Sequence, residues 1–97
     1  MRFDIILAPQ AAEDLKWLKA NARTVVRMAL ETHLRHEPTK TGRSRIRRLR
    51  GTSRPQFRLR IGDVRVFYDV VDERVEILAI VAKAEAAEWL AQFGDAE

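Results

Sequence analysis

Residues 56–71 read QFRLRIGDVRVFYDVV, and this stretch decides the fold. Apolar and polar side chains alternate on both sides of Gly62-Asp63, and a Gly-Asp pair between two alternating runs is typical of a β-hairpin turn. If these two residues form the turn, Leu59 faces Val66 across the hairpin, and the other apolar pairs lie on the same side. We expect that side to pack against helices.

The opposite side of the predicted hairpin is basic. The same register places Arg60 directly across from Arg65, with Arg58 diagonal to Arg65 on the same face. Opposed like charges destabilise a sheet by about 0.2–1 kcal/mol, the scale of a cross-strand pair. The pattern therefore predicts an anion-binding face, because a polyanion would reverse the repulsion. Alternatively, each arginine extends into solvent or pairs with an acid, such as Asp69, Glu76 or the acids near the C-terminus.

Basic charge is concentrated around this hairpin. Residues 40–65 hold ten basic residues and one acid, a net charge of +9, whereas the rest of the chain holds eight bases and thirteen acids, a net charge of −5. Nine of the ten bases are arginines, whose planar guanidinium groups bind phosphate through paired hydrogen bonds. A solvated face or a disordered basic tail is the alternative, but a tail would not bury the apolar residues threaded through this block. The candidate RNA-binding residues before the hairpin are Arg43, Arg45, Arg47, Arg48, Arg50 and Arg54.

The residues before the basic block predict a strand and two helices. Residues 3–7 form a short apolar run, and Pro9 suits the first turn of a helix that follows. Apolar residues at spacings of four, three and four extend this helix to about residue 20. After a break at Asn21, a second helix is expected from about residue 22 to residue 36. Pro38 ends it, because a residue before proline avoids helical backbone angles.

The residues after the hairpin complete an α+β domain. Residues 75–82 are almost all apolar and predict a strand buried on both faces, and residues 85–93 predict a short helix that Trp89 and Phe93 hold against the sheet. Residues 45–50 fit neither a helical nor a strand period, so their conformation stays open. We therefore expect one domain over residues 1–97, with strand, helix and helix followed by a three- to four-stranded antiparallel sheet and a short C-terminal helix.

The composition excludes several kinds of chemistry. There is no cysteine, so a disulfide, a thiolate nucleophile and a cysteine zinc site are excluded. Because the sequence has no glycine-rich phosphate loop and no metal-ligand spacing, we expect neither a cofactor nor a metal. His33 falls on the apolar face of the second predicted helix, where a packed or hydrogen-bonded role is expected. The first apolar run is too short for a signal peptide or a membrane span, so we expect a cytoplasmic protein without a membrane partner.

Residues 48–85 resemble the C-terminal half of toxins of the RelE/ParE superfamily. The shared features are a Leu-Arg-Gly turn at residues 49–51, a basic strand, a tight turn and an Arg-Val-x-Tyr strand at residues 65–68. The preceding strand and two helices follow the order of the family, so the resemblance covers nearly the whole chain. It implies a RelE-like toxin of a type II toxin-antitoxin system, a ribosome-dependent endoribonuclease that cuts mRNA and inhibits translation. It also implies a cognate antitoxin that binds the toxin in a hetero-oligomer, with the ribosome and mRNA as the other partners.

The resemblance transfers to individual residues only in part. Arg58 and Arg60 match two basic residues on one strand of the RNA-cleaving members, and Arg65 matches their arginine on the next strand. These members also have an arginine just after the last strand and a tyrosine several residues later. This sequence has Ala84 and Leu90 at those two positions.

The nearest replacements lie one position earlier, at Lys83 and Trp89. RNA cleavage needs a base for the 2'-hydroxyl, positive charge at the phosphate and an acid for the leaving oxygen. Arginine holds its proton too tightly to be a good base, so Lys83, Glu85, Glu88 or a ribosomal group is needed. The candidate catalytic residues are Arg58, Arg60, Arg65 and Lys83.

The sequence is compatible with two other functions. One is a ParE-like toxin that binds DNA gyrase without cutting RNA, which the absence of the family arginine and tyrosine would allow. The other is a module that keeps only its affinity for RNA and antitoxin. The basic side of the hairpin favours the nuclease, because a protein target would not need so many contacts of the phosphate type.

Overall fold

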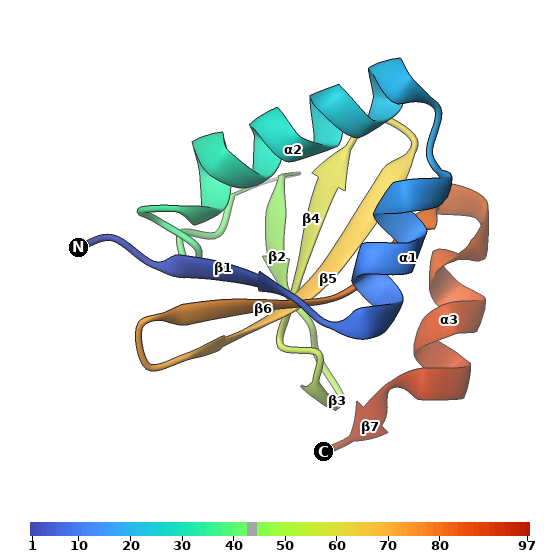
Figure 1. Cartoon of the computed structure of the whole chain (residues 1–97). Coiled ribbons are helices and arrows are strands. Elements are labelled where there is room, and N and C mark those ends of the chain that lie inside the picture. The colour runs from blue at the N-terminus through green and yellow to red at the C-terminus, as the bar shows by residue number, and fades with distance from the viewer. Residues whose placement is uncertain (43–44) are drawn as a thin grey trace.

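The computed structural model describes residues 1–42 and 45–97, and it has the expected α+β architecture (Figure 1). A mixed sheet is combined with three α-helices and a small separate strand pair. In chain order the described elements are β1 (Asp4–Leu7), α1 (Pro9–Trp17), α2 (Ala20–Leu34), β2 (Ile46–Arg48), β3 (Thr52–Arg54), β4 (Phe57–Ile61), β5 (Val64–Val71), β6 (Arg74–Ala82), the 3-10 turn η1 (Lys83–Glu85), α3 (Ala86–Phe93) and β7 (Asp95–Ala96).

The main sheet has five strands in the order β1-β6-β5-β4-β2. The last four of these strands pair antiparallel, as the sequence predicts. The first strand differs, because β1 runs parallel to β6 and makes the sheet mixed. A long stretch of chain separates β1 from β6, so no tight turn dictates their relative direction.

The structure also settles the stretch that the sequence left open. Residues 46–48 form the edge strand β2, in which Ile46 is buried and pairs with Leu59. The short strands β3 and β7 were not predicted, and they pair Thr52 with Ala96. This second sheet joins the end of the chain to the segment that leads into β4.

One face of the sheet carries the hydrophobic core. Leu59, Val66 and Tyr68 of the hairpin pack with buried residues of α1 and α2, as expected. The hydroxyl of Tyr68 donates a 2.7 Å hydrogen bond to the carbonyl oxygen of Pro38, which holds the loop after α2 over the core. On the opposite face Trp89 of α3 stacks on Phe67, with ring centroids 4.9 Å apart. The helices therefore lie on both faces of the sheet, with α3 on the face that carries Phe67.

The break between the two long helices falls earlier than expected. Leu18 and Lys19 have extended backbone angles, so α1 ends at Trp17 and α2 already includes Asn21. The guanidinium of Arg23 bridges the break, because it donates hydrogen bonds to three carbonyl oxygens at the end of α1 and just after it, those of Leu15, Lys16 and Leu18. Among the described helices, none is both long and apolar enough to cross a bilayer.

Candidate nucleic acid interface

The predicted hairpin register is confirmed residue by residue. Arg60 pairs with Arg65, and Leu59 pairs with Val66 on the core side. Gly62 has a φ of +56°, the left-handed conformation that glycine adopts without a steric penalty in a tight turn. The arginines of both strands therefore lie on the face opposite to α1 and α2.

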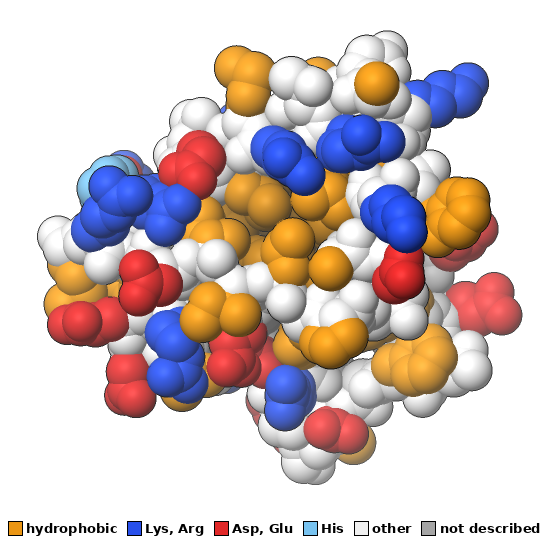
Figure 2. Space-filling view, in the orientation of Figure 1, with side chains coloured by type: hydrophobic (Ala, Val, Ile, Leu, Met, Phe, Trp, Pro, Cys, Tyr) orange, Lys and Arg blue, Asp and Glu red, His pale blue; other side chains and the backbone are white. Residues whose placement is uncertain are grey.

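The edge strand adds to this basic face. Arg47 of β2 pairs with Arg58 of β4, and Arg58 in turn lies across from Phe67 of β5. Three strands thus bring Arg47, Arg58, Arg60 and Arg65 to the same side of the sheet, which we call the arginine face. The face that carries α1 and α2 is different, because basic side chains there are interspersed with acidic and apolar ones (Figure 2).

The guanidinium of Arg58 experiences the crowding on the arginine face most strongly. Its burial is the largest cause that lowers the pKa of Arg58, and repulsion by neighbouring guanidinium groups lowers it further. Those neighbours are Arg65, Arg47 and Arg60. An anion bound here would offset both the lost hydration and the repulsion.

Arg65 is held in a way that the sequence did not reveal. It is only 7% exposed, and its Nη1 donates hydrogen bonds of 2.7 Å to the carbonyl oxygen of Gly62 and 3.0 Å to that of Val64. The guanidinium therefore folds back onto the turn and braces it. This geometry explains how Arg65 is accommodated opposite Arg60.

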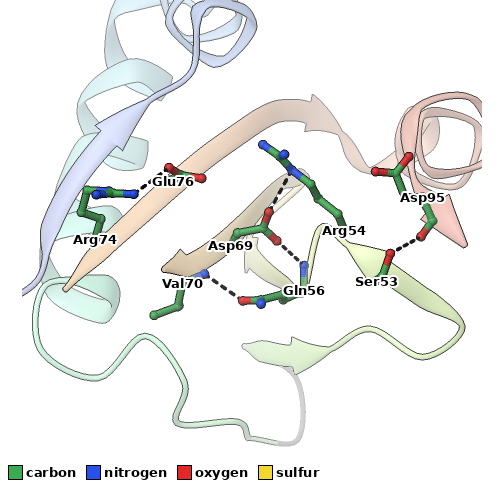
Figure 3. A network of polar contacts seen from close by, with 8 residues as sticks. All are labelled: Ser53, Arg54, Gln56, Asp69, Val70, Arg74, Glu76 and Asp95. Atoms are coloured by element: carbon green, nitrogen blue, oxygen red, sulfur yellow. Dashed lines mark hydrogen bonds and ion pairs between the residues drawn. The ribbon is translucent and has the colours of Figure 1, made fainter. Parts of the chain in front are cut away.

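Two of the acids expected as alternative partners, Asp69 and Glu76, bind other arginines (Figure 3). Asp69 is buried, and its Oδ2 lies 3.0 Å from Nε of Arg54. Glu76 pairs with Arg74 at 3.6 Å. Arg54, expected to bind RNA, is thus held in an ion pair, although more than half of its side chain remains exposed.

The same figure shows why Asp69 is part of the framework. Its Oδ1 accepts a 2.7 Å hydrogen bond from the amide of Gln56, and Oε1 of Gln56 accepts a 2.9 Å bond from the amide of Val70. Burial raises the pKa of Asp69, whereas the Gln56 amide and the charge of Arg54 act in the opposite direction. The network fixes the start of β4 against β5, and so it positions the arginine face.

Three of the predicted RNA-binding arginines gather on β2 and the turn that follows it. Arg47, Arg48 and Arg50 line an open hollow of about 710 Å³, and Arg58 completes its wall from β4. The guanidinium carbon of Arg48 also lies 5.3 Å from the centroid of the Phe57 ring, a cation-π arrangement. Arg43 lies outside the described residues.

The candidate base lies beside the turn of the hairpin. The amide of Lys83 donates a 2.7 Å hydrogen bond to the carbonyl oxygen of Asp63, and the Lys83 side chain is exposed. The structure therefore places Lys83 next to the turn that Arg65 braces. Trp89, in contrast, stacks on Phe67, which confirms that it helps to hold α3 against the sheet.

His33 makes a contact that sequence reasoning only partly anticipated. Its Nε2 lies 2.6 Å from Nη1 of Arg45, which confirms a hydrogen-bonded histidine. The identity of the partner could not be predicted, because Arg45 belongs to the segment whose conformation was open.

Most of the chain matches a known protein family. Residues 5–87 match the family described as the ParE toxin of type II toxin-antitoxin systems, parDE. The chain belongs to this family. The protein is therefore a toxin of a type II toxin-antitoxin system with a RelE/ParE fold. No curated protein sequence matches it.

Solved structures agree with the fold of the toxin. It is similar to a chain of the RelBE2 toxin-antitoxin complex from Mycobacterium tuberculosis, with 26% identity, a TM-score of 0.62 and coverage of 84% of this chain and 99% of that one. The YoeB dimer from Staphylococcus aureus is 22% identical, with a TM-score of 0.61 and coverage of 81% and 94%. An arginine-to-alanine variant of Escherichia coli RelE in the free state is 20% identical, with a TM-score of 0.60 and coverage of 94% and 93%.

Proposed function

We propose that this toxin is a ribosome-dependent mRNA endoribonuclease that inhibits translation. The observation that carries the proposal is the arginine face, where three strands bring four arginines to one side of the sheet, and where burial and then repulsion by the neighbouring arginines lower the pKa of Arg58. Such a surface suits the phosphodiester backbone of a single-stranded RNA. The structural similarity to RelE and YoeB supports the same conclusion.

The proposed reaction uses positive charge more than acid-base groups of the toxin. The 2'-oxygen attacks the adjacent phosphorus, the bond from phosphorus to the 5'-oxygen breaks, and the leaving oxygen takes up a proton from water. Arg58 and Arg60 stabilise the negative charge that builds on the phosphate in the transition state. Arg65, whose guanidinium is held against the turn, adds positive charge near Arg58. Lys83, a nearby glutamate or a ribosomal group removes the proton from the 2'-hydroxyl.

The proposed RNA contacts outside the reacting phosphate lie along β2. Arg47, Arg48 and Arg50 line one hollow and would contact neighbouring phosphates there. The arginines at positions 43, 45 and 54 are further proposed contacts for RNA phosphates. Because the ribosome and mRNA are the proposed targets, the toxin acts in the cytoplasm.

We further propose that a cognate antitoxin neutralises the toxin in a hetero-oligomer. Two of the similar structures are RelB–RelE antitoxin-toxin complexes, from Methanococcus jannaschii and Pyrococcus horikoshii. An antitoxin segment with acidic residues, folding as it binds, would cover the arginine face and exclude RNA from it.

A ParE-like attack on DNA gyrase is the second candidate. It is favoured by the match to the ParE toxin family and by Ala84 and Leu90, which stand where RNA-cleaving relatives carry an arginine and a tyrosine. In that case the arginine face would bind protein or DNA, and no RNA would be cut.

Expression of the toxin with and without its antitoxin distinguishes these functions. We expect growth arrest that co-expression relieves, with new mRNA 5' ends that appear within coding regions of translated messages. The double variant Arg58→Ala/Arg60→Ala should lose the new ends, whereas Arg27→Ala, which removes an exposed charge from α2, should keep them. Growth arrest with DNA breaks that depend on gyrase and no new mRNA ends would establish the second candidate instead.

A further inference from the structure

A small hollow lies at the end of the sheet, where α2 passes the β4–β5 turn. Figure 1 shows α2 running past the ends of β2 and β4, which brings these distant segments together. The hollow has a volume of about 210 Å³, and none of the described residues in its wall is acidic. It is lined by Ala29, His33, Arg45, Arg60, Ile61 and Gly62.

The hydrogen bond between His33 and Arg45 orients one cation of this wall. A guanidinium has only donors, so Nη1 of Arg45 donates and Nε2 of His33 accepts across the 2.6 Å contact. The ring proton of the neutral histidine is therefore on Nδ1. Burial lowers the pKa of His33, and the charge of Arg45 lowers it further, so both favour the neutral acceptor.

Backbone pairing holds the second cation of the wall beside the first. The amide of Arg60 donates a 2.8 Å hydrogen bond to the carbonyl oxygen of Arg45, and Arg60 also pairs with Arg65 across the hairpin. Arg60 thus belongs both to the arginine face and to the wall of the hollow. The side chain of Arg60 therefore connects the basic surface of the arginine face with that of the hollow.

We propose that His33 and Arg45, together with Arg60 shared from the arginine face, form a phosphate subsite, which binds the phosphodiester next to the reacting one in an RNA strand on the arginine face. The inference rests on the proposed function, because it extends that interface around the end of the sheet. The two guanidinium groups supply the charge and the paired donors that phosphate requires. His33 is a positioning residue, since it acts through the orientation of Arg45.

The test uses binding of a short single-stranded RNA that carries 2'-O-methyl groups, so that cleavage does not interfere. The logarithm of affinity is measured against the logarithm of salt concentration, and each contacted phosphate contributes about 0.7 to the slope. We expect Arg45→Ala and Arg60→Ala each to flatten the slope by about that amount. Arg27→Ala, the matched control, should leave the slope unchanged.

Two substitutions of the histidine separate positioning from simple packing. His33→Leu keeps a side chain of similar size but removes the acceptor, so it should flatten the slope about as much as Arg45→Ala. The two substitutions together should flatten the slope no more than either one alone. His33→Gln retains an acceptor and should restore most of the slope. The subsite is refuted if His33→Leu and Arg45→Ala bind as tightly as the original protein at every salt concentration.

Nuclear magnetic resonance of the His33 ring identifies the source of the phosphate. The ring resonances should shift when the RNA oligonucleotide is added, and Arg60→Ala should abolish the shift. A shift with inorganic phosphate alone, absent with the oligonucleotide, would overturn the assignment to a nucleic acid strand.

If the variants behave as expected but mRNA is never cut, the subsite stands and the nuclease function fails. If mRNA is cut and only Arg58→Ala flattens the slope, the nuclease function stands and the subsite fails.

Discussion

Replacing Arg65 with alanine has two opposite effects on the stability of the hairpin, and the two differ in size. In the sequence Arg65 faces Arg60, so its removal should relieve a repulsion of about 0.2–1 kcal/mol and stabilise the hairpin slightly. In the structure the same side chain is buried and its guanidinium donates two hydrogen bonds to the carbonyl oxygens of Gly62 and Val64. The structure therefore predicts a loss of stability where the sequence alone predicts a small gain.

The magnitude follows from the contacts. Hydrogen bonds that involve a charged group contribute about 1.5–3 kcal/mol each when buried, and less here because the turn carbonyls regain water when the side chain is removed. After the relieved repulsion is subtracted, we expect Arg65→Ala to lower the free energy of unfolding by about 1–2 kcal/mol. Since 1 kcal/mol shifts Tm by about 4–8 °C in a domain of 60–100 residues, Tm should fall by roughly 4–16 °C.

Urea and thermal unfolding, followed by circular dichroism, measure this change. Arg60→Ala is the matched control, because Arg60 is exposed and its removal relieves the same repulsion without unbracing the turn. Arg65→Met keeps most of the buried aliphatic stem, so it isolates the effect of the guanidinium. An Arg65→Ala protein as stable as the original, or more stable, would show that repulsion outweighs the two hydrogen bonds and that the reasoning is wrong.

Three further predictions concern the last helix, the histidine and the candidate base. Trp89→Ala should lower stability by about 2–3 kcal/mol in urea unfolding, because it removes the stack on Phe67 that holds α3, and an unchanged midpoint would contradict this packing role. The lowered pKa of His33 means that the folded state binds its proton less readily than the unfolded state. Stability should therefore fall as the pH drops below about 6.5, a component that His33→Gln should lack when unfolding is compared at pH 5.5 and 7.5. Lys83→Met should slow mRNA cleavage on saturating ribosomes by about 100-fold while ribosome binding persists, whereas an unchanged rate would assign the base elsewhere.

The sequence by itself determined the hairpin and the identity of its two faces. A two-residue turn fixes which residues oppose one another, and the period of two along a strand then assigns every side chain to one face. For this reason the pairing of Arg60 with Arg65 and the apolar pairing of Leu59 with Val66 could be predicted without coordinates. The α+β class and the packing of Trp89 followed from the same kind of local periodicity.

Only the tertiary structure decided how the arginines are used. The parallel pairing of β1, the strand pair β3–β7 and the partner of His33 all join residues distant in sequence, and no local pattern specifies such contacts. Side-chain direction is also beyond a periodic pattern, because a long arginine can turn toward any acceptor within its reach. The sequence places Arg65 on the basic face, but the carbonyl oxygens of its own turn hold its guanidinium there, and those acceptors converge only after the hairpin has closed.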